Sequence, residues 1–528
     1  MDITRFLSRD LTTLKIPRTK LDKSEIDKVI EKVQKVIVRH NHLSIETFSV
    51  IVSIVNNLTS LEISSCFFFE RNIVFSQLIG ANLQYLNLSE NSIESSGAKS
   101  IADVLLTNTT LISLNIGYNN IKKGGADAIA NALKFNSTLT ELNLESNHIK
   151  GSINVECNTV LTSLNLRLNQ IRFCINTTLT YLNLSSNNIQ GEMISDALGE
   201  NYSLQTLNLS RNRISKTACY ALANALSENT TLTELNLSSN IINDGALLIA
   251  NALKQNTTLM FLDISSNFPK SDLGECFGEA LKINTSLTTL SIASSMIQYN
   301  GICKFLEAIQ SNPTLINLDI SENGIGSIDN SAFFQLLERN TILTSLNFGY
   351  NSIGFNNFES IKSFLENNTS LISLNMKGNS ICDPDCTVIK SLGCNTTLQS
   401  LNIEYCRIGD DGGIILGEIL QNNTTLTDLN IGWNSIEERG RMMIAKALEF
   451  NTTLRTLFHS DDCFERDESE EIAESLLKSM ETNTTLTSLN FFDMELEPYC
   501  FHIHYLLDIN KENSPEMNLI SVKPAIAY

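Results

Sequence analysis

The stretch that decides the fold is "TTLTELNLSSNIINDGALLIANALKQN", which runs from Thr230 to Asn256. Its first half alternates apolar and polar residues around Leu235 and Leu237, a spacing that is typical of a β-strand. Its second half places apolar residues along one face of a helix, at Ala246, Ile249, Ala250 and Leu253. The stretch therefore predicts a short strand, a turn and a helix.

The same pattern returns along most of the 528 residues. Aligned on the phrase L-x-x-L-x-L-x-x-N, most successive copies begin about 28 residues apart. The copies begin at Leu58, Leu83, Leu111, Leu139, Leu161, Leu179, Leu204, Leu232, Leu259, Leu287, Leu315, Leu343, Leu371, Leu398, Leu426, Leu454 and Leu486. Self-similarity at a regular period predicts an array of about 17 repeats instead of several unrelated domains.

This phrase, followed by a helix in most copies, resembles the leucine-rich repeat superfamily, and specifically its ribonuclease-inhibitor-like class. A single strand and helix cannot bury both of their apolar faces, so each repeat must stack on the next one. The strands are then expected to join in one parallel sheet. Because helices are wider than strands, we expect an α/β solenoid shaped like a horseshoe, with the sheet on the concave side and the helices on the convex side.

An asparagine ends the strand phrase in most copies, at the point where the chain turns inward. A buried amide there needs hydrogen-bond partners, which backbone groups of the adjacent turns can supply. We predict a structural ladder of Asn91, Asn119, Asn147, Asn187, Asn212, Asn240, Asn323 and Asn434, with Cys66 and Cys406 replacing Asn at the same position. Asn256 is expected to close its helix in the left-handed conformation.

The "NTT" and "NTS" triplets that follow most helices match the N-glycosylation acceptor pattern. They recur at one place in the repeat, and the sequence begins without a stretch that is typical of a signal peptide. We therefore interpret them as a helix stop followed by a turn.

The ends and two short repeats depart from the regular pattern. Residues 1–57 combine a degenerate repeat, "LTTLKIPRTKL", with two expected helices, "SEIDKVIEKVQKVIVRH" and "SIETFSVIVSIV", and predict an N-terminal cap. Residues 58–494 form the array, and residues 495–528 are expected to hold a capping helix at 498–510 and a loose tail. The repeats within 150–178 are too short for full helices, which indicates either a tolerated deletion or a functional feature, namely a hinge or a second contact site.

Composition limits the partners and the compartment. The formal net charge of −20 disfavours binding to a phosphate backbone over most of the surface, so we expect no nucleic acid and a neutral or basic protein partner. The 12 cysteines are scattered instead of paired, which favours reduced thiols and a cytoplasmic protein. The longest apolar stretch, "FSVIVSIV", is too short for membrane insertion.

Sequence motifs point away from catalysis and from cofactors. The chain contains no G-x-x-x-x-G-K-[ST], H-E-x-x-H or G-x-S-x-G motif. His502 and His504 lack a second set of metal ligands at suitable spacing. A further cysteine set misses the C-x-x-C spacing and falls at different repeat phases: Cys382, Cys386, Cys394 and Cys406. We expect neither a metal site nor a cofactor, and we interpret the acidic stretch "HSDDCFERDESEE" as a solvated loop.

These observations favour a non-catalytic scaffold that binds a partner protein on the concave face. The resemblance also implies two alternatives, a regulator that activates a GTPase and an inhibitor of a basic enzyme, although no catalytic residue can be matched to the first. The Asn-rich style of the repeats, as in "NTTLTELNLS" at Asn229–Ser238, is similar to repeat proteins that intracellular bacterial pathogens deliver into host cells. That similarity implies an effector, secreted by a route without a classical signal peptide.

Three aromatic residues, Tyr350, Tyr405 and Trp433, share one phase of the repeat, directly before the ladder residue. Adjacent strands lie about 4.8 Å apart, so Tyr405 and Trp433 should be lateral neighbours. They are candidate anchors for the partner, with charge supplied by Lys377, Glu404 and Asp428. The alternative is that the aromatic rings only pack on each other or shield the turn. If this site is wrong, the next candidates are Tyr85, Tyr118 and Tyr181.

Overall fold

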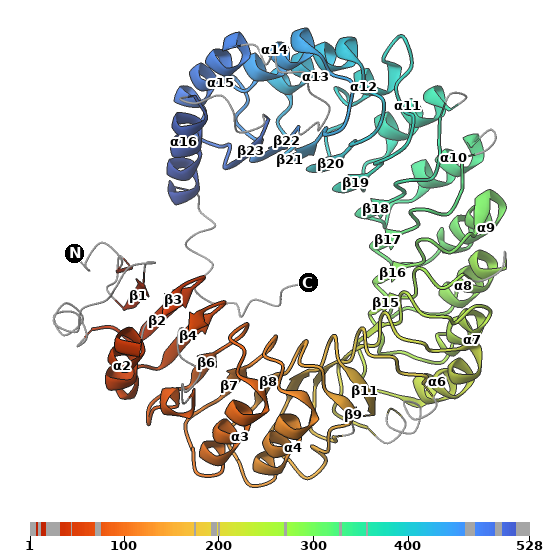
Figure 1. Ribbon diagram of the computed structural model, residues 1–528. Helices are drawn as coiled ribbons and strands as arrows, with labels where there is room; N and C mark the ends of the chain where they lie inside the picture. The colour runs from red at the N-terminus through yellow and green to blue at the C-terminus, as the bar shows by residue number, and fades with distance from the viewer. Residues whose placement is uncertain are drawn as a thin grey trace. The chain divides into compact units, whose positions relative to one another are not determined.

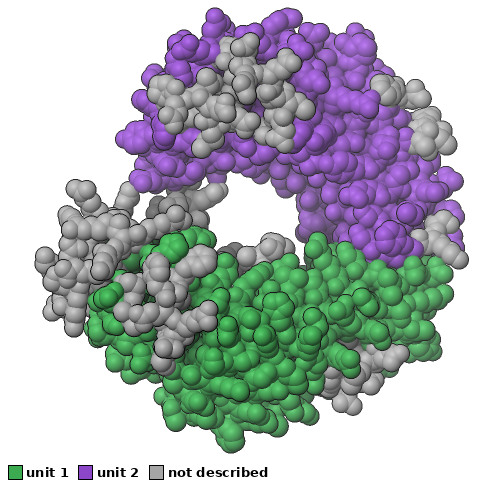
Figure 2. All heavy atoms as spheres, in the orientation of Figure 1, with its two compact units in different colours: residues 1–263 green, residues 264–528 purple. Residues whose placement is uncertain are grey.

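The computed structural model describes residues 7–8, 12–16, 32–43, 45–68, 75–173, 176–191, 198, 201–268, 272–326, 330–354, 357–459, 470–491 and 499–513. The chain divides into two compact units, Met1–Asp263 and Ile264–Tyr528 (Figure 2). Each unit is a stack of repeats in which a parallel sheet lies on one side and helices lie on the other (Figure 1). The predicted α/β solenoid is therefore confirmed.

In the first unit, each main strand pairs in parallel with the next one along the chain. These strands are β1 (Thr13–Ile16), β2 (Lys35–Arg39), β4 (Ser60–Ser64), β6 (Tyr85–Asn87), β7 (Ser113–Asn115), β8 (Glu141–Asn143), β10 (Ser163–Asn165), β12 (Tyr181–Asn183), β13 (Thr206–Asn208), β14 (Glu234–Asn236) and β15 (Phe261–Asp263). The helical segments are α2 (Ile45–Ile54), η2 (Val55–Asn57), η3 (Phe75–Leu78), α3 (Glu94–Leu105), α4 (Lys122–Leu133), α6 (Lys216–Glu228) and α7 (Gly245–Ala252).

The second unit repeats the same arrangement. Its strands are β16 (Thr289–Ser291), β17 (Asn317–Asp319), β18 (Ser345–Asn347), β19 (Ser373–Asn375), β20 (Ser400–Asn402), β21 (Asp428–Asn430), β22 (Thr456–Phe458) and β23 (Ser488–Asn490). Its helices are α8 (Leu273–Leu281), α9 (Gln298–Ile309), α10 (Ser331–Arg339), α11 (Phe358–Asn367), α12 (Thr387–Ser391), α13 (Asp410–Asn422), α14 (Glu438–Ala447), α15 (Glu470–Thr482) and α16 (Tyr499–Asn513). None of the helices that the structure describes has the length and hydrophobicity needed to cross a bilayer.

The repeat from Leu232 shows how the two periodicities produce one core. Leu235 in β14 and Leu237 directly after it are fully buried, and so are Ala246, Ile249 and Ala250 on one face of α7. Burying a leucine or isoleucine side chain stabilises the fold by about 1.5–3 kcal/mol. The core therefore runs between the sheet and the helices, as the spacing predicts.

The N-terminal segment corrects one prediction. Residues Lys35–Arg39 were expected within a helix, but they form β2, which pairs with β1 on one side and with β4 on the other. Val36 and Val38 are fully buried, and alternation of buried β-branched residues suits a strand better than a helix. Residues 24–31 of the expected helix lie outside the described residues, whereas the second expected helix is present as α2.

At the other end, α16 occupies the position of the expected capping helix. Its Asn510 side chain donates to the carbonyl oxygens of Asn483 and Leu486, at 2.9 and 2.8 Å, which ties the helix to the preceding repeat. The tail from residue 514 and the acidic stretch at 460–469 lie outside the described residues. The domain boundaries at residues 57 and 494 stay predictions.

The short repeats replace helices with extended chain. Between β8 and β12 the described residues form no helix, and β9 (Lys150–Ser152) pairs in parallel with β11 (Gln170–Phe173) on the helical side of the stack (Figure 1). A second side pair, β3 (His42–Leu43) and β5 (Phe67–Phe68), lies near the N-terminus. Extended chain spans a repeat with fewer residues than a helix needs, so the stack continues through the shortened repeats.

The asparagine after each helix corrects a second prediction. Asn256 does not adopt the left-handed conformation, and its side chain makes hydrogen bonds instead. Its Nδ2 donates to the Leu226 carbonyl oxygen of the preceding repeat, while its Oδ1 accepts from the backbone N–H of Leu259. Because Asn256 is only 2% exposed, its "NTT" triplet has no free amide for a glycan in the folded chain.

Candidate functional site

In most of the described repeats, the residue directly before the ladder position adopts the left-handed conformation. Tyr350, Tyr405 and Trp433 occupy this position after β18, β20 and β21, with φ between 53° and 55°. Ser239, Ser266 and Ser294 occupy it in other repeats. Any residue with a Cβ carries a conformational cost at positive φ, and glycine, which occupies this position as Gly378, avoids that cost.

Two of these aromatic side chains stack on each other. The ring centroids of Tyr405 and Trp433 are 5.1 Å apart, and the ring planes differ by only 11°. Tyr405 nevertheless remains 44% exposed. The rings therefore pack on each other, as the alternative interpretation holds, and still present an open aromatic surface.

Tyr350 joins this pair through Lys377. The Lys377 ammonium lies 5.6 Å from the centre of the Tyr350 ring and 5.9 Å from the centre of the Tyr405 ring, within the range of a cation–π interaction. Gly378, in the left-handed position of the intervening repeat, provides the space, because a Cβ there would lie 2.3 Å from the Tyr350 ring. We call Tyr350, Lys377, Tyr405 and Trp433 the aromatic cluster.

A partly buried ion pair fixes the lysine of the cluster. Lys377 Nζ lies 2.8 Å from Glu404 Oε1, and Asn430 Nδ2 donates to Glu404 Oε2 at 3.0 Å. Desolvation lowers the pKa of Lys377, but hydrogen bonds and attraction from Glu404 and Tyr350 outweigh it, so the pKa stays above its ordinary value. Lys377 is therefore a fixed cation over the pH range in which proteins fold.

A hollow of about 450 Å³ lies against the cluster. Its lining adds Gly378, Ser380, Arg407 and Ser435 to the predicted aromatic residues. Arg407 could have been found from the sequence, because it lies two residues after Tyr405. Gly378 contributes only the space that its missing side chain leaves for the Tyr350 ring, which the sequence does not indicate. Asp428 is not brought to this hollow: it begins β21 and accepts a hydrogen bond from Thr427 at 2.7 Å.

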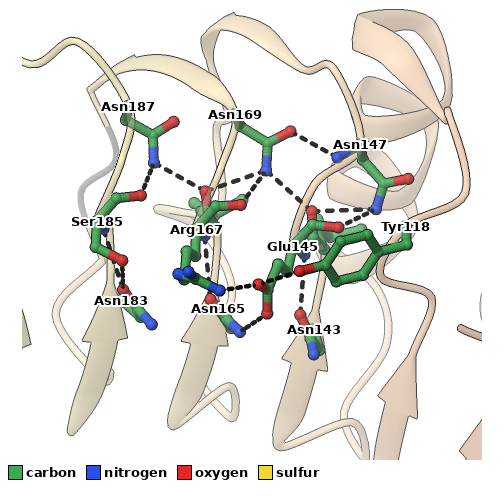
Figure 3. Close-up of polar contacts among 12 residues, drawn as sticks. Tyr118, Asn143, Glu145, Asn147, Asn165, Arg167, Asn169, Asn183, Ser185 and Asn187 are labelled. Carbon is green, nitrogen blue, oxygen red and sulfur yellow. Dashed lines mark hydrogen bonds and ion pairs between the residues drawn. The ribbon is translucent and has the colours of Figure 1, made fainter. Parts of the chain in front are cut away.

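The ladder asparagines connect each turn to the repeats on both sides (Figure 3). Asn169 Nδ2 donates to the carbonyl oxygens of Leu144, Leu166 and Arg167, and its Oδ1 accepts from the backbone N–H of Asn147 at 3.0 Å. Comparable bonds are made by Asn91, Asn119, Asn147, Asn187, Asn212, Asn240, Asn323 and Asn434. These side chains satisfy buried backbone groups, so their role is architectural.

The two cysteines at this position keep part of the same pattern. The backbone N–H of Cys66 donates to Asn91 Oδ1, and that of Cys406 donates to Asn434 Oδ1. Their thiols lie 3.3 Å from the carbonyl oxygens of Ser64 and Met376, respectively. Burial raises the pKa of Cys406 to about 12, which keeps its thiol protonated and unreactive.

A smaller network of polar side chains, formed by Tyr118, Glu145 and Arg167, lies in the first unit (Figure 3). The Tyr118 hydroxyl donates to Glu145 Oε1 at 2.9 Å, and Arg167 Nη1 lies 2.6 Å from the same oxygen. Desolvation is the largest cause that raises the pKa of Tyr118, and the hydrogen bond to Glu145 and the negative charge of Glu145 raise this pKa further. Tyr85 and Tyr181 instead begin strands β6 and β12, so the three N-terminal aromatic residues do not share one phase.

The structure does not gather the cysteine and histidine candidates into one set of three ligands. Cys382 and Cys386 approach to 3.9 Å between their sulfur atoms. Burial and then the neighbouring Cys382 raise the pKa of Cys386 to about 12, which opposes the thiolate form that metals require. Within the part of the chain that the structure describes, no three His, Cys, Asp or Glu residues are placed to hold a metal ion.

A family model described as Leucine Rich repeat matches nine segments of the chain, at residues 81–102, 107–130, 135–153, 157–172, 176–192, 200–223, 228–248, 394–417 and 422–445. No curated protein sequence matches the chain. Among solved structures, the chain is similar to the one described as "Crystal structure of TLR13-ssRNA13 complex", with 19% identity and a TM-score of 0.56 over 91% of this chain. It spans 65% of that solved chain's length.

A second solved structure, "Leiomodin-1 Actin-Binding Site 2 (ABS2)", is 23% identical and covers 31% of this chain and 94% of its own. Its TM-score of 0.28 is too low to support an argument. The first similarity supports the fold alone, because its identity is below the level at which binding properties could be transferred.

Proposed function

Because the chain is a leucine-rich repeat protein, we propose that it is a non-catalytic scaffold and that the aromatic cluster anchors a partner protein. The observation that carries this proposal is the open stack of Tyr405 on Trp433, extended by Lys377 to Tyr350. Aromatic residues dominate the binding energy of protein interfaces, and a well-packed ring loses little conformational freedom on binding.

Electrostatics favour a neutral or basic protein as the partner. The net charge of −20 speeds encounter with a basic protein and repels polyanions over most of the surface. The solved TLR13 chain is described as a complex with ssRNA13, so single-stranded RNA belongs in the test as a competitor. The absence of nucleic-acid binding stays a prediction.

The remaining details of the proposal depend on sequence patterns. Free thiols among the described cysteines support action in a reducing cytosol, and the effector role depends only on the style of the Asn-rich phrase. GTPase regulation and inhibition of a basic enzyme remain the alternatives. Phosphate release from candidate GTPases mixed with the purified chain would detect the first of them.

The test is capture of a partner from cytosol on the immobilised chain, followed by affinity measurement with the captured protein. Replacing Tyr405 and Trp433 together by alanine is expected to weaken binding at least tenfold, about 1.4 kcal/mol, because the exposed aromatic surface is lost. Circular dichroism should stay unchanged.

The matched control replaces Tyr202 and Tyr220, which are 75% and 64% exposed and lie outside the cluster, by alanine. This control should bind like the parent chain. Full affinity in a folded Tyr405→Ala/Trp433→Ala variant would reject the site. Equal losses of affinity in both double variants would show that exposed aromatic residues contribute to binding wherever they lie on the chain.

A further inference from the structure

A second hollow lies in the first unit, where the short repeats lack helices. It encloses about 800 Å³ and is lined by the start of α4, by β9 and β11, and by residues that follow β12 and β13. Four lining residues are cations: Lys123, Lys150, Arg172 and Arg213. Among the described residues that line it there is no aspartate or glutamate, although the chain carries a net charge of −20. We call it the basic hollow.

Three of these cations have no side-chain partner among the residues that the structure describes. Lys123 forms an ion pair with Asp127 on its own helix, at 2.9 Å. The exposed side chains of Lys150, Arg172 and Arg213 make no hydrogen bond or ion pair with any other residue that the structure describes. Gathering like charges around one hollow is unfavourable, and a bound anion would relieve that repulsion.

The backbone holds these side chains in place. Lys150 pairs with Gln170 across β9 and β11, and the backbone N–H of Arg213 donates to the Ile189 carbonyl oxygen at 2.9 Å. Ile171, Ile189 and Ile214 are buried next to the exposed positions. Buried isoleucines alternate with exposed polar residues, so the cations extend from backbone that hydrogen bonds hold in place. A site that is ordered before binding loses less entropy when the ligand binds.

We propose that the basic hollow binds a compact anion that carries two or three phosphate groups. The guanidinium groups of Arg172 and Arg213 can each form two parallel hydrogen bonds to a phosphate, and Lys150 adds a third unpaired charge. Its volume is in the range of small-molecule sites. The amides of Gln170, Asn188 and Gln190 supply polar contacts for the rest of the ligand.

Two features favour a compact ligand over a nucleic-acid strand. None of the described lining residues is aromatic, and single-stranded nucleic acids are bound through base stacking on aromatic rings. A strand would also extend beyond the hollow onto a surface that is acidic overall. A compact anion interacts mainly with the cations that line the hollow.

The test is calorimetric titration of the full chain with pyrophosphate and with tripolyphosphate at low salt. Both anions are expected to bind, and Arg213→Gln should weaken binding at least tenfold because one guanidinium is lost. Arg211→Gln is the matched control. It removes the same charge only two residues away, and the Arg211 side chain does not line the hollow. Its affinity should stay within twofold of the parent chain. Lys150→Gln provides a second variant at another strand, with the same expected loss.

Three results would overturn the proposal. The first is no heat of binding from either anion at millimolar concentration. The second is an equal loss in Arg213→Gln and Arg211→Gln, which would show a general charge effect. The third is tighter binding of single-stranded RNA that Arg213→Gln abolishes, which would assign the hollow to a nucleic acid.

Discussion

Asn240→Leu is expected to lower the free energy of unfolding by about 3 kcal/mol, because it leaves several buried backbone groups without a partner. Asn240 is 3% exposed, and its Nδ2 donates to the carbonyl oxygens of Leu209, Leu237 and Ser238. Its Oδ1 accepts from the backbone N–H of Ile214. Leucine has a similar size but can neither donate nor accept, so the loss is one of hydrogen bonding more than of volume. The shift of the urea unfolding midpoint measures it.

The control for this variant is Asn251→Leu in the same repeat. Asn251 is exposed on α7, and leucine has a better helix propensity than asparagine, so stability should stay equal or rise slightly. Repeat arrays can unfold in several steps, so the transition that includes the altered repeat is the one to compare. Equal midpoints for Asn240→Leu and Asn251→Leu would reject the ladder role of Asn240.

Gly274→Ala is expected to destabilise the second unit by about 2–3 kcal/mol, although alanine normally favours a helix over glycine by about 1 kcal/mol. A Cβ on Gly274 in α8 would lie 2.2 Å from the carbonyl oxygen of Gly301 in α9 and 2.6 Å from its carbonyl carbon. Backbone atoms cannot rotate away as a side chain can. The two helices must therefore separate, and the core between them loses contacts. Thermal unfolding of the variant measures the loss.

Gly124→Ala in α4 is the control with the opposite expected sign. Its Cβ would meet nothing closer than the Ser95 hydroxyl, at 3.9 Å. The substitution should therefore stabilise the chain by about 0.5–1 kcal/mol through the lower entropy of the unfolded state. Stabilisation by both substitutions would show that helix propensity, and not the contact between α8 and α9, controls the effect.

Local periodicity was enough to predict most of the fold. In the repeat from Leu232, the residues that are buried are those at strand and helix spacing, because a strand and a helix each repeat within a few residues. The strand at Lys35–Arg39 was missed because its sequence continues a helical spacing from residue 24. Its pairing with β1 and β4 decides its structure, and those contacts are distant in sequence.

The aromatic cluster could be predicted only in part. Repeat phase placed Tyr405 beside Trp433, and the structure stacks their rings. The position of Lys377 between two tyrosines depends on side-chain conformations, and the space that Gly378 leaves for Tyr350 has no sequence signal of its own. Asp428 was grouped with the cluster by closeness in sequence, although it lies at the opposite end of its strand. Whether the cluster binds a partner stays a proposal.

The shortened repeats show which side of the array tolerates a change in repeat length. The ladder continues through Asn169 and Asn187, which accept from the backbone N–H groups of Asn147 and Ile171, although the spacing between successive ladder residues falls to 22 and 18. The strand and its asparagine therefore keep these repeats in register without a helix between β8 and β12 among the described residues. New repeat lengths can accumulate in the gene while the strand register stays fixed. The side of the stack that carries helices elsewhere can thus differ between repeats while the sheet stays regular, and the basic hollow lies on β9 and β11, where the helices are missing.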